Sequence, residues 1–144
     1  MYPQEFAQLC RSYVGVRFLE GGRNPKQGLD CVGVIGAALT ELGIPFEDAH
    51  GYCLNHGCDN YGLLCGRLSS CFSVASSPWS VGDVIAYKHR LCNGHALVYV
   101  GEMGGVPFVV EAVRGKRVQL RPVEGDWATR IEGSGGEFSV WRLS

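Results

Sequence analysis

The chain has 144 residues, of which 46% are apolar and 19% charged, and its 13 basic and 14 acidic residues leave a formal net charge of -1. This composition is typical of one ordinary globular domain, and it lacks the excess of positive charge expected of a protein that binds nucleic acid or an anionic membrane. The apolar runs are a few residues long, far short of the roughly 20 that a membrane helix needs. We therefore expect a single domain over residues 1–144, with no membrane span and no nucleic-acid partner.

The N-terminus has no basic segment followed by an apolar stretch, so the sequence predicts no secretory signal and synthesis in the cytoplasm. The chain contains seven cysteines, which is an odd number, and it has no predicted export signal. A framework of disulfides is therefore not expected.

The first 46 residues have the pattern of two helices joined by a loop. Apolar residues spaced three and four apart predict a helix within residues 1–20, interrupted near Gly15. The Gly and Pro content of residues 21–28 predicts a loop.

The second helix is predicted over residues 31–42. Asp30 is a favourable N-cap, and Gly43 with a nearby proline ends the helix. Gly33 and Gly36 are costly inside a helix, so they indicate close packing against a sheet.

Residues 46–78 are harder to interpret, with one short helix predicted around residues 61–68. Beyond Val81 an alternation of apolar and polar residues replaces the helical period. It predicts five short strands, at 84–87, 95–100, 107–113, 118–123 and 137–143. Helices followed by adjacent strands predict an α+β domain with a mainly antiparallel sheet of about five strands.

Cys31 falls in the first turn of the second predicted helix, directly after Asp30. The backbone N–H groups and the positive end of the helix dipole stabilise a thiolate there, and the same N–H groups could hold a developing oxyanion. Cys31 is therefore the candidate nucleophile, although most free cysteines are simply small buried apolar residues.

His95 and Glu111 are the candidate partners of that thiol. His95 begins a predicted strand, where it is either a half-buried structural histidine or a general base that later protonates the leaving amine. Glu111 is the only charged residue of the apolar strand 108–113, so it either lies exposed on an edge strand or is buried with a partner. If that partner is His95, Glu111 orients the imidazole as the third member of a catalytic triad.

Motifs in this order and spacing resemble those of the NlpC-type cell-wall cysteine peptidases, a papain-like family of compact α+β domains. Their nucleophile motif resembles GLDCVGVI at residues 28–35, and their histidine motif resembles GHALVYVG at 94–101. Residues 13–18 with the glycine pair at 21–22 resemble their N-terminal signature, and residues 82–85 resemble the turn before their first sheet strand. Glu111 stands where the family has its third polar residue, usually a histidine followed by alanine.

The resemblance is closest to a short, single-domain branch encoded with bacteriophage tails and gene transfer agents. Further similarity to that branch lies at residues 51–52, 63–68, 127–130 and 140–143. This implies a protein at or near a tail tip, which opens peptidoglycan in the cell wall or periplasm during entry. Its implied partners are the peptidoglycan stem peptide as substrate and other tail proteins.

Members of the family hydrolyse the amide between γ-linked D-glutamate and a diamino acid in the stem peptide. The resemblance implies that Cys31 attacks the carbonyl, His95 moves the proton and Glu111 orients His95, with no metal or organic cofactor. Two positions depart from the family pattern. Val32 stands where many relatives have a serine that helps to bind the substrate, and Phe18 where many have a tyrosine whose hydroxyl lies in the site.

Three other interpretations remain open. Five soft ligands within 20 residues could bind zinc, although their spacing lacks the paired knuckles of common zinc sites: Cys53, His56, Cys58, Cys65 and Cys71. The chain could instead be a noncatalytic tail module, or an amidase or acyltransferase for another acyl substrate. Four basic residues after the glutamate strand could contact the tail or an anionic wall polymer, but a solvated strand face is the favoured interpretation: Arg114, Lys116, Arg117 and Arg121.

Overall fold

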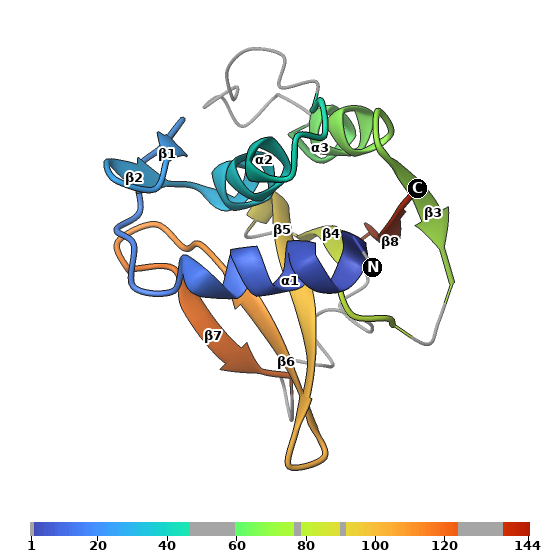
Figure 1. Cartoon of the computed structure of the whole chain (residues 1–144). Helices are drawn as coiled ribbons and strands as arrows, with labels where there is room; N and C mark the ends of the chain where they lie inside the picture. The colour runs from blue at the N-terminus through green and yellow to red at the C-terminus, as the bar shows by residue number, and fades with distance from the viewer. Residues whose placement is uncertain (1, 47–59, 77–78, 90–91, 124–136) are drawn as a thin grey trace.

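The computed structural model of the chain describes residues 2–46, 60–76, 79–89, 92–123 and 137–144 (Figure 1). Within these ranges there are three helices, α1 (Tyr2–Ser12), α2 (Cys31–Glu41) and α3 (Asn60–Leu68). A two-stranded hairpin is formed by β1 (Arg23–Asn24) and β2 (Gly28–Leu29). The main sheet contains six strands: β3 (Phe72–Ala75), β4 (Val84–His89), β5 (Cys92–Met103), β6 (Val106–Glu111), β7 (Gln119–Pro122) and β8 (Glu137–Leu143).

The main sheet has the strand order β3-β8-β4-β5-β6-β7, and every neighbouring pair is antiparallel. This confirms the predicted α+β architecture with an antiparallel sheet, but the sheet has six strands rather than about five. The additional strand is β3, which is only four residues long and lies at the sheet edge. Its two central residues are both exposed, so it lacks the alternation by which the other strands were predicted.

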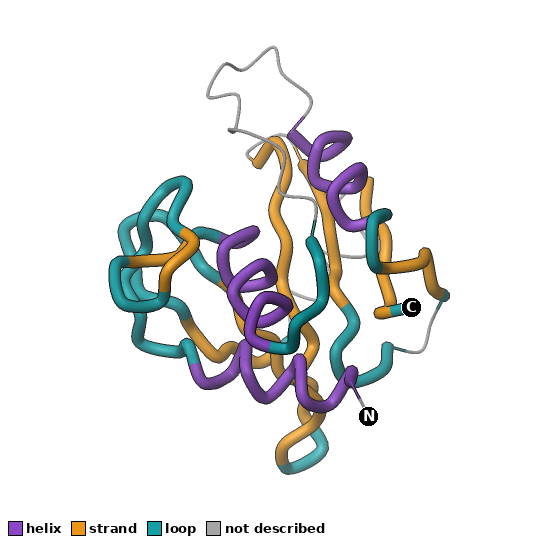
Figure 2. The backbone as a smooth tube through the Cα atoms, turned by 45° about the horizontal axis from the view of Figure 1, so that its top comes forward, coloured by secondary structure: helices purple, strands orange, loops and turns teal. Residues whose placement is uncertain are grey.

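The three helices pack on one face of the main sheet, as both views of the backbone show (Figures 1 and 2). On β4 and β5, the alternate residues that face the helices, such as Val84 and Val98, form the main core with α1, α2 and α3. The residues between them, such as Ile85 and Leu97, form a second cluster on the opposite face of the sheet. Because alternate side chains of a strand point to opposite faces, the central strands are buried on both sides.

The helices follow the sequence prediction closely. The segment 1–20 is helical up to Ser12, and Gly15 then adopts a φ of 97°, a left-handed conformation that favours glycine. The short helix predicted around residues 61–68 is α3. No helix in the described ranges is both long and apolar enough to cross a membrane.

Candidate active site

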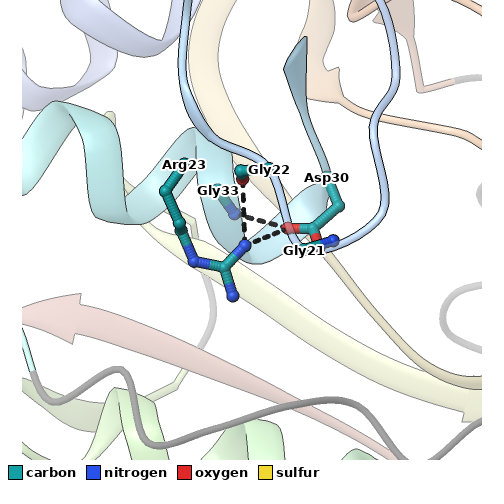
Figure 3. A network of polar contacts seen from close by, with 5 residues as sticks. All are labelled: Gly21, Gly22, Arg23, Asp30 and Gly33. Atoms are coloured by element: carbon teal, nitrogen blue, oxygen red, sulfur yellow. Dashed lines mark hydrogen bonds and ion pairs between the residues drawn. The ribbon is translucent and has the colours of Figure 1, made fainter. Parts of the chain in front are cut away.

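The first turn of α2 is held by its N-cap residue, Asp30. One carboxylate oxygen of Asp30 accepts hydrogen bonds from Gly33 N at 2.7 Å and from Arg23 Nη1 at 2.8 Å, and the other accepts one from Gly21 N at 2.7 Å (Figure 3). Asp30 thus confirms its predicted capping role and also ties the 21–23 segment to the helix. The backbone position of Cys31, the first residue of α2, is fixed by these contacts.

The glycine at position 33 is required by the same contact. A Cβ atom placed on Gly33 would lie 2.0 Å from the carbonyl oxygen of Gly22, to which Arg23 Nη1 also donates a hydrogen bond. Gly36 has only ordinary contacts, chiefly with the Phe46 ring. Close packing at Gly33 was therefore predicted correctly, but its partner is the loop before the helix rather than a sheet.

His95 lies near the start of β5, opposite Tyr87 of β4. The two rings meet edge to face, with centroids 5.6 Å apart and planes at 89°. His95 Nε2 lies 2.9 Å from Oε2 of Glu111, the last residue of the neighbouring strand β6. The imidazole is thereby oriented from both sides by its neighbours in the sheet.

The Glu111 carboxylate is buried, with a side-chain exposure of 2%. Its second oxygen, Oε1, accepts a hydrogen bond from Arg121 Nη1 of β7 at 2.8 Å. Because β6 lies between β5 and β7, Glu111 is not on an edge strand, and the alternative of a surface glutamate is wrong.

The electrostatics of the site favour alternating charges. Burial alone would raise the pKa of Glu111, but the hydrogen bonds and positive charges of His95 and Arg121 outweigh it and lower that pKa. Burial opposes the charged form of His95, yet hydrogen bonds with Cys31 and Glu111 and the charges of both groups raise the pKa of His95 to about 10. The site thus favours an imidazolium on His95 beside a carboxylate on Glu111.

These contacts also determine how the two ring nitrogens of His95 are used. An ionised carboxylate can only accept hydrogen bonds, so Nε2 of His95 must donate to Glu111. Nδ1 is then the nitrogen left to interact with the Cys31 thiol, which is the other hydrogen-bonding partner of the ring. His95 can therefore exchange a proton with Cys31 while Glu111 holds its far side.

Backbone donors for an oxyanion are present in the first turn of α2. The N–H groups of Cys31 and Val32 have no acceptor within the helix because they belong to its first turn. The Val32 side chain is fully buried in the main core. Phe18 pairs with Leu29 just before the helix, and its ring packs against the same core.

The structure brings together all three predicted site residues, Cys31, His95 and Glu111. Sequence reasoning missed Arg121, which it interpreted as part of a solvated strand face. The missed signal was a pair of opposite charges on two successive predicted strands, since β6 and β7 pair so that Arg121 lies diagonally across from Glu111.

The alternative zinc ligands are only partly described. Cys53, His56 and Cys58 lie outside the described residues. Cys65 and Cys71 are free thiols, and Cys65 lies 3.8 Å from the Ser139 hydroxyl. In the part of the chain that the structure describes, three or more His, Cys, Asp or Glu residues do not gather as metal ligands would.

Comparisons with known proteins do not assign this chain to a family. A scan against protein-family models found no match to this chain, and a search of curated proteins found no significant match. The site is therefore interpreted from its own geometry and from the sequence motifs.

Proposed function

We propose that the chain is a papain-like cysteine peptidase of the NlpC type, which hydrolyses amide bonds of peptidoglycan stem peptides. The observation that carries this proposal is the position of His95. Its ring lies between a cysteine at a helix N-terminus and a buried, ionised glutamate. That is the arrangement of nucleophile, base and orienting group needed for acyl transfer through a thioester.

The proposed reaction has two halves. The Cys31 thiolate attacks the amide carbonyl, and the negative charge that develops on oxygen is held by N–H groups of the first turn of α2. The His95 imidazolium then gives its proton to the leaving amine nitrogen as the C–N bond breaks, which leaves a thioester on Cys31. Neutral His95 next takes a proton from water, whose oxygen attacks the thioester, and the C–S bond breaks to release the carboxylic acid and the Cys31 thiolate, which restores the starting pair.

The motifs support the substrate class, and the bond between γ-D-glutamate and the diamino acid is the proposed cleavage point. Association with a phage-type tail, and action in the cell wall or periplasm, are supported by the sequence resemblance at residues 51–52, 63–68, 127–130 and 140–143. Val32 is buried and Phe18 is apolar, so neither side chain supplies a hydroxyl group to bind the substrate. Substrate contacts must then come from other groups.

The test is cleavage of a defined tetrapeptide muropeptide by the purified protein, with a reductant and a chelator present and products resolved by mass spectrometry. We expect cleavage after γ-D-glutamate, and a loss of about 10⁴-fold or more in Cys31→Ala. Cys71→Ala is the matched control, because it removes another partly buried free thiol that is not a partner of His95. It is expected to cleave at the wild-type rate.

Three results would contradict the proposal. Cleavage that survives in Cys31→Ala would exclude a cysteine nucleophile at this position. Failure of folded wild-type protein to cleave, together with slow alkylation of Cys31 at neutral pH, would instead favour the noncatalytic tail module. Hydrolysis of a different acyl substrate with the same dependence on Cys31 would favour the other amidase or acyltransferase.

A further inference from the structure

The Glu111 carboxylate contacts two positively charged groups at once. Oε2 faces Nε2 of His95 at 2.9 Å, and Oε1 faces Nη1 of Arg121 at 2.8 Å. Arg121 lies directly opposite Val109, so its side chain reaches diagonally along β6 to meet the carboxylate. The Arg121 side chain is 37% exposed, whereas that of Glu111 is 2% exposed. Arg121 thus lies between the buried site and solvent.

A charged carboxylate beside His95 poses a problem that a neutral orienting group would not. It stabilises the imidazolium, but catalysis also requires His95 to give up its proton and act as a base. It can also rotate or take up the proton itself. A second cation on the opposite carboxylate oxygen limits rotation, because it fixes the plane of the carboxylate. It also limits proton uptake by the carboxylate and stabilisation of the imidazolium, because it balances part of the negative charge.

We propose that Arg121 is a positioning residue of the active site, which holds Glu111 ionised and turned toward His95. This inference rests on the proposed function for its effect on catalysis. Arg121 acts through Glu111, whose carboxylate it contacts, and not on the reacting atoms themselves. The site is then a row of alternating charges formed by Cys31, His95, Glu111 and Arg121.

The sign of its effect on pH dependence follows from the groups that face one another. His95 is faced by Cys31 from α2, Tyr87 from β4 and Glu111 from β6, and Glu111 is faced in turn by Arg121 from β7. Loss of one positive charge raises the pKa of every acid near it. Removal of the Arg121 charge must therefore move the loss of protons from Cys31, His95 and Glu111 to higher pH.

The experiment compares pH profiles of kcat/KM for wild type, Arg121→Gln and Arg121→Lys. In Arg121→Gln we expect both limbs of the profile to move to higher pH by about one unit, with about a tenfold loss at neutral pH. In Arg121→Lys, which keeps the charge, the limbs are expected to stay in place. Arg114→Gln is the charge-matched control, because Arg114 is 71% exposed and pairs with Glu20 rather than with the site.

A second measurement needs no substrate. The rate at which iodoacetamide alkylates Cys31, followed by mass spectrometry of its peptide, reports the thiolate as a function of pH. We expect its midpoint to rise in Arg121→Gln and not in Arg114→Gln. If the wild type cleaves no muropeptide, the proposed function fails while this midpoint still decides the role of Arg121.

Unshifted limbs and an unshifted alkylation midpoint in folded Arg121→Gln would overturn the inference. An equal shift in Arg114→Gln would also overturn it, because net charge alone would then explain the effect. If Arg121→Gln does not fold, Arg121→Met keeps the apolar stem of the side chain and is expected to show the same upward shift.

Discussion

Glu111 makes the imidazole of His95 more basic than a neutral orienting side chain would. Burial lowers the pKa of His95, but the hydrogen bonds and charges of Cys31 and then of Glu111 outweigh it and raise that pKa to about 10. A high pKa favours protonation of the leaving amine, which is the demanding step when an amide rather than an ester is cleaved. The same property would slow the second half of the proposed reaction, in which His95 must be neutral.

The substitution Glu111→Gln separates the hydrogen bond of Glu111 to His95 from its negative charge. The amide keeps a hydrogen-bond acceptor for His95 Nε2 but removes the negative charge, so the pKa of His95 falls. We expect the basic limb of the kcat/KM profile to move to lower pH, opposite in direction to Arg121→Gln, with roughly a tenfold loss of activity at neutral pH. Steady-state hydrolysis across pH 5 to 10 measures both effects.

Glu102→Gln serves as its control, because Glu102 is an exposed residue near the other end of β5. Its profile should overlay that of wild type. A basic limb that stays in place in Glu111→Gln would mean that the carboxylate charge does not govern His95.

The sequence predicted those residues of the candidate site whose chemistry is recognisable within a single segment. Cys31 was found by its place after a helix cap, and Glu111 by its isolation in an apolar strand. Arg121 was not found, because its role depends on the register of β6 with β7. That register is set by the connection between the strands and by packing of the whole sheet, neither of which is apparent in a single segment.

At the scale of the element, the first turn of α2 depends on one glycine. Gly33→Ala would place a methyl group 2.0 Å from the Gly22 carbonyl oxygen, so either the helix or the 21–23 loop must move. We expect a loss of about 2 kcal/mol or more in the free energy of unfolding, together with reduced reactivity of Cys31. Urea denaturation and the alkylation rate measure the two effects.

Gly66→Ala is a matched substitution in α3. Among the described residues, a Cβ atom there would meet nothing within 4 Å, so alanine is expected to stabilise the protein by about 0.5–1 kcal/mol through its higher helix propensity. If Gly33→Ala were equally harmless, the close contact between the loop and α2 would not be important for the site.

The elements that the sequence predicted best have strong local signals. α2 has a cap and a glycine stop, and β8 was predicted with the bounds that it has in the structure. β5 extends beyond its predicted range of 95–100 to Cys92–Met103, because it continues into a hairpin with β6 past Gly101. β1 and β2 are only two residues each and were predicted as loop, since so short a pair has no periodicity.

For the whole molecule, buried ionisable groups predict a fall in stability at alkaline pH. The pKa of His95 is raised, so its contribution is complete below pH 6.5 and is lost as the pH rises through about 10. Burial also raises the pKa of the Cys10 thiol above its usual range. Burial, with the charges of Glu41 and Cys10, raises the pKa of Tyr13 to about 12. Both groups therefore ionise more readily in the unfolded chain.

We expect the free energy of unfolding to change little between pH 7 and 8.5, because the proton on His95 in the folded protein is matched by the one on the Cys31 thiol of the unfolded chain. Above about pH 9 it is expected to fall by roughly 1 kcal/mol per pH unit or more. On the acid side, the lowered pKa of Glu111 means that its contribution is lost as the pH falls below 4.5. Urea denaturation at pH 7.5, 9 and 10 measures the slope. It should be shallower in Glu111→Gln, and a flat profile in wild type would contradict the expectation.

The order of strands in the main sheet also constrains how the chain folds as it is synthesised. β8 is the last strand in the sequence, yet it lies between β3 and β4. A nascent chain that has emerged from the ribosome as far as residue 123 contains Cys31, His95, Glu111 and Arg121, but its β3 has no neighbour in the sheet and its β4 has an open edge. Open edges invite pairing between chains, so aggregation is most probable in this interval, and insertion of β8 ends it.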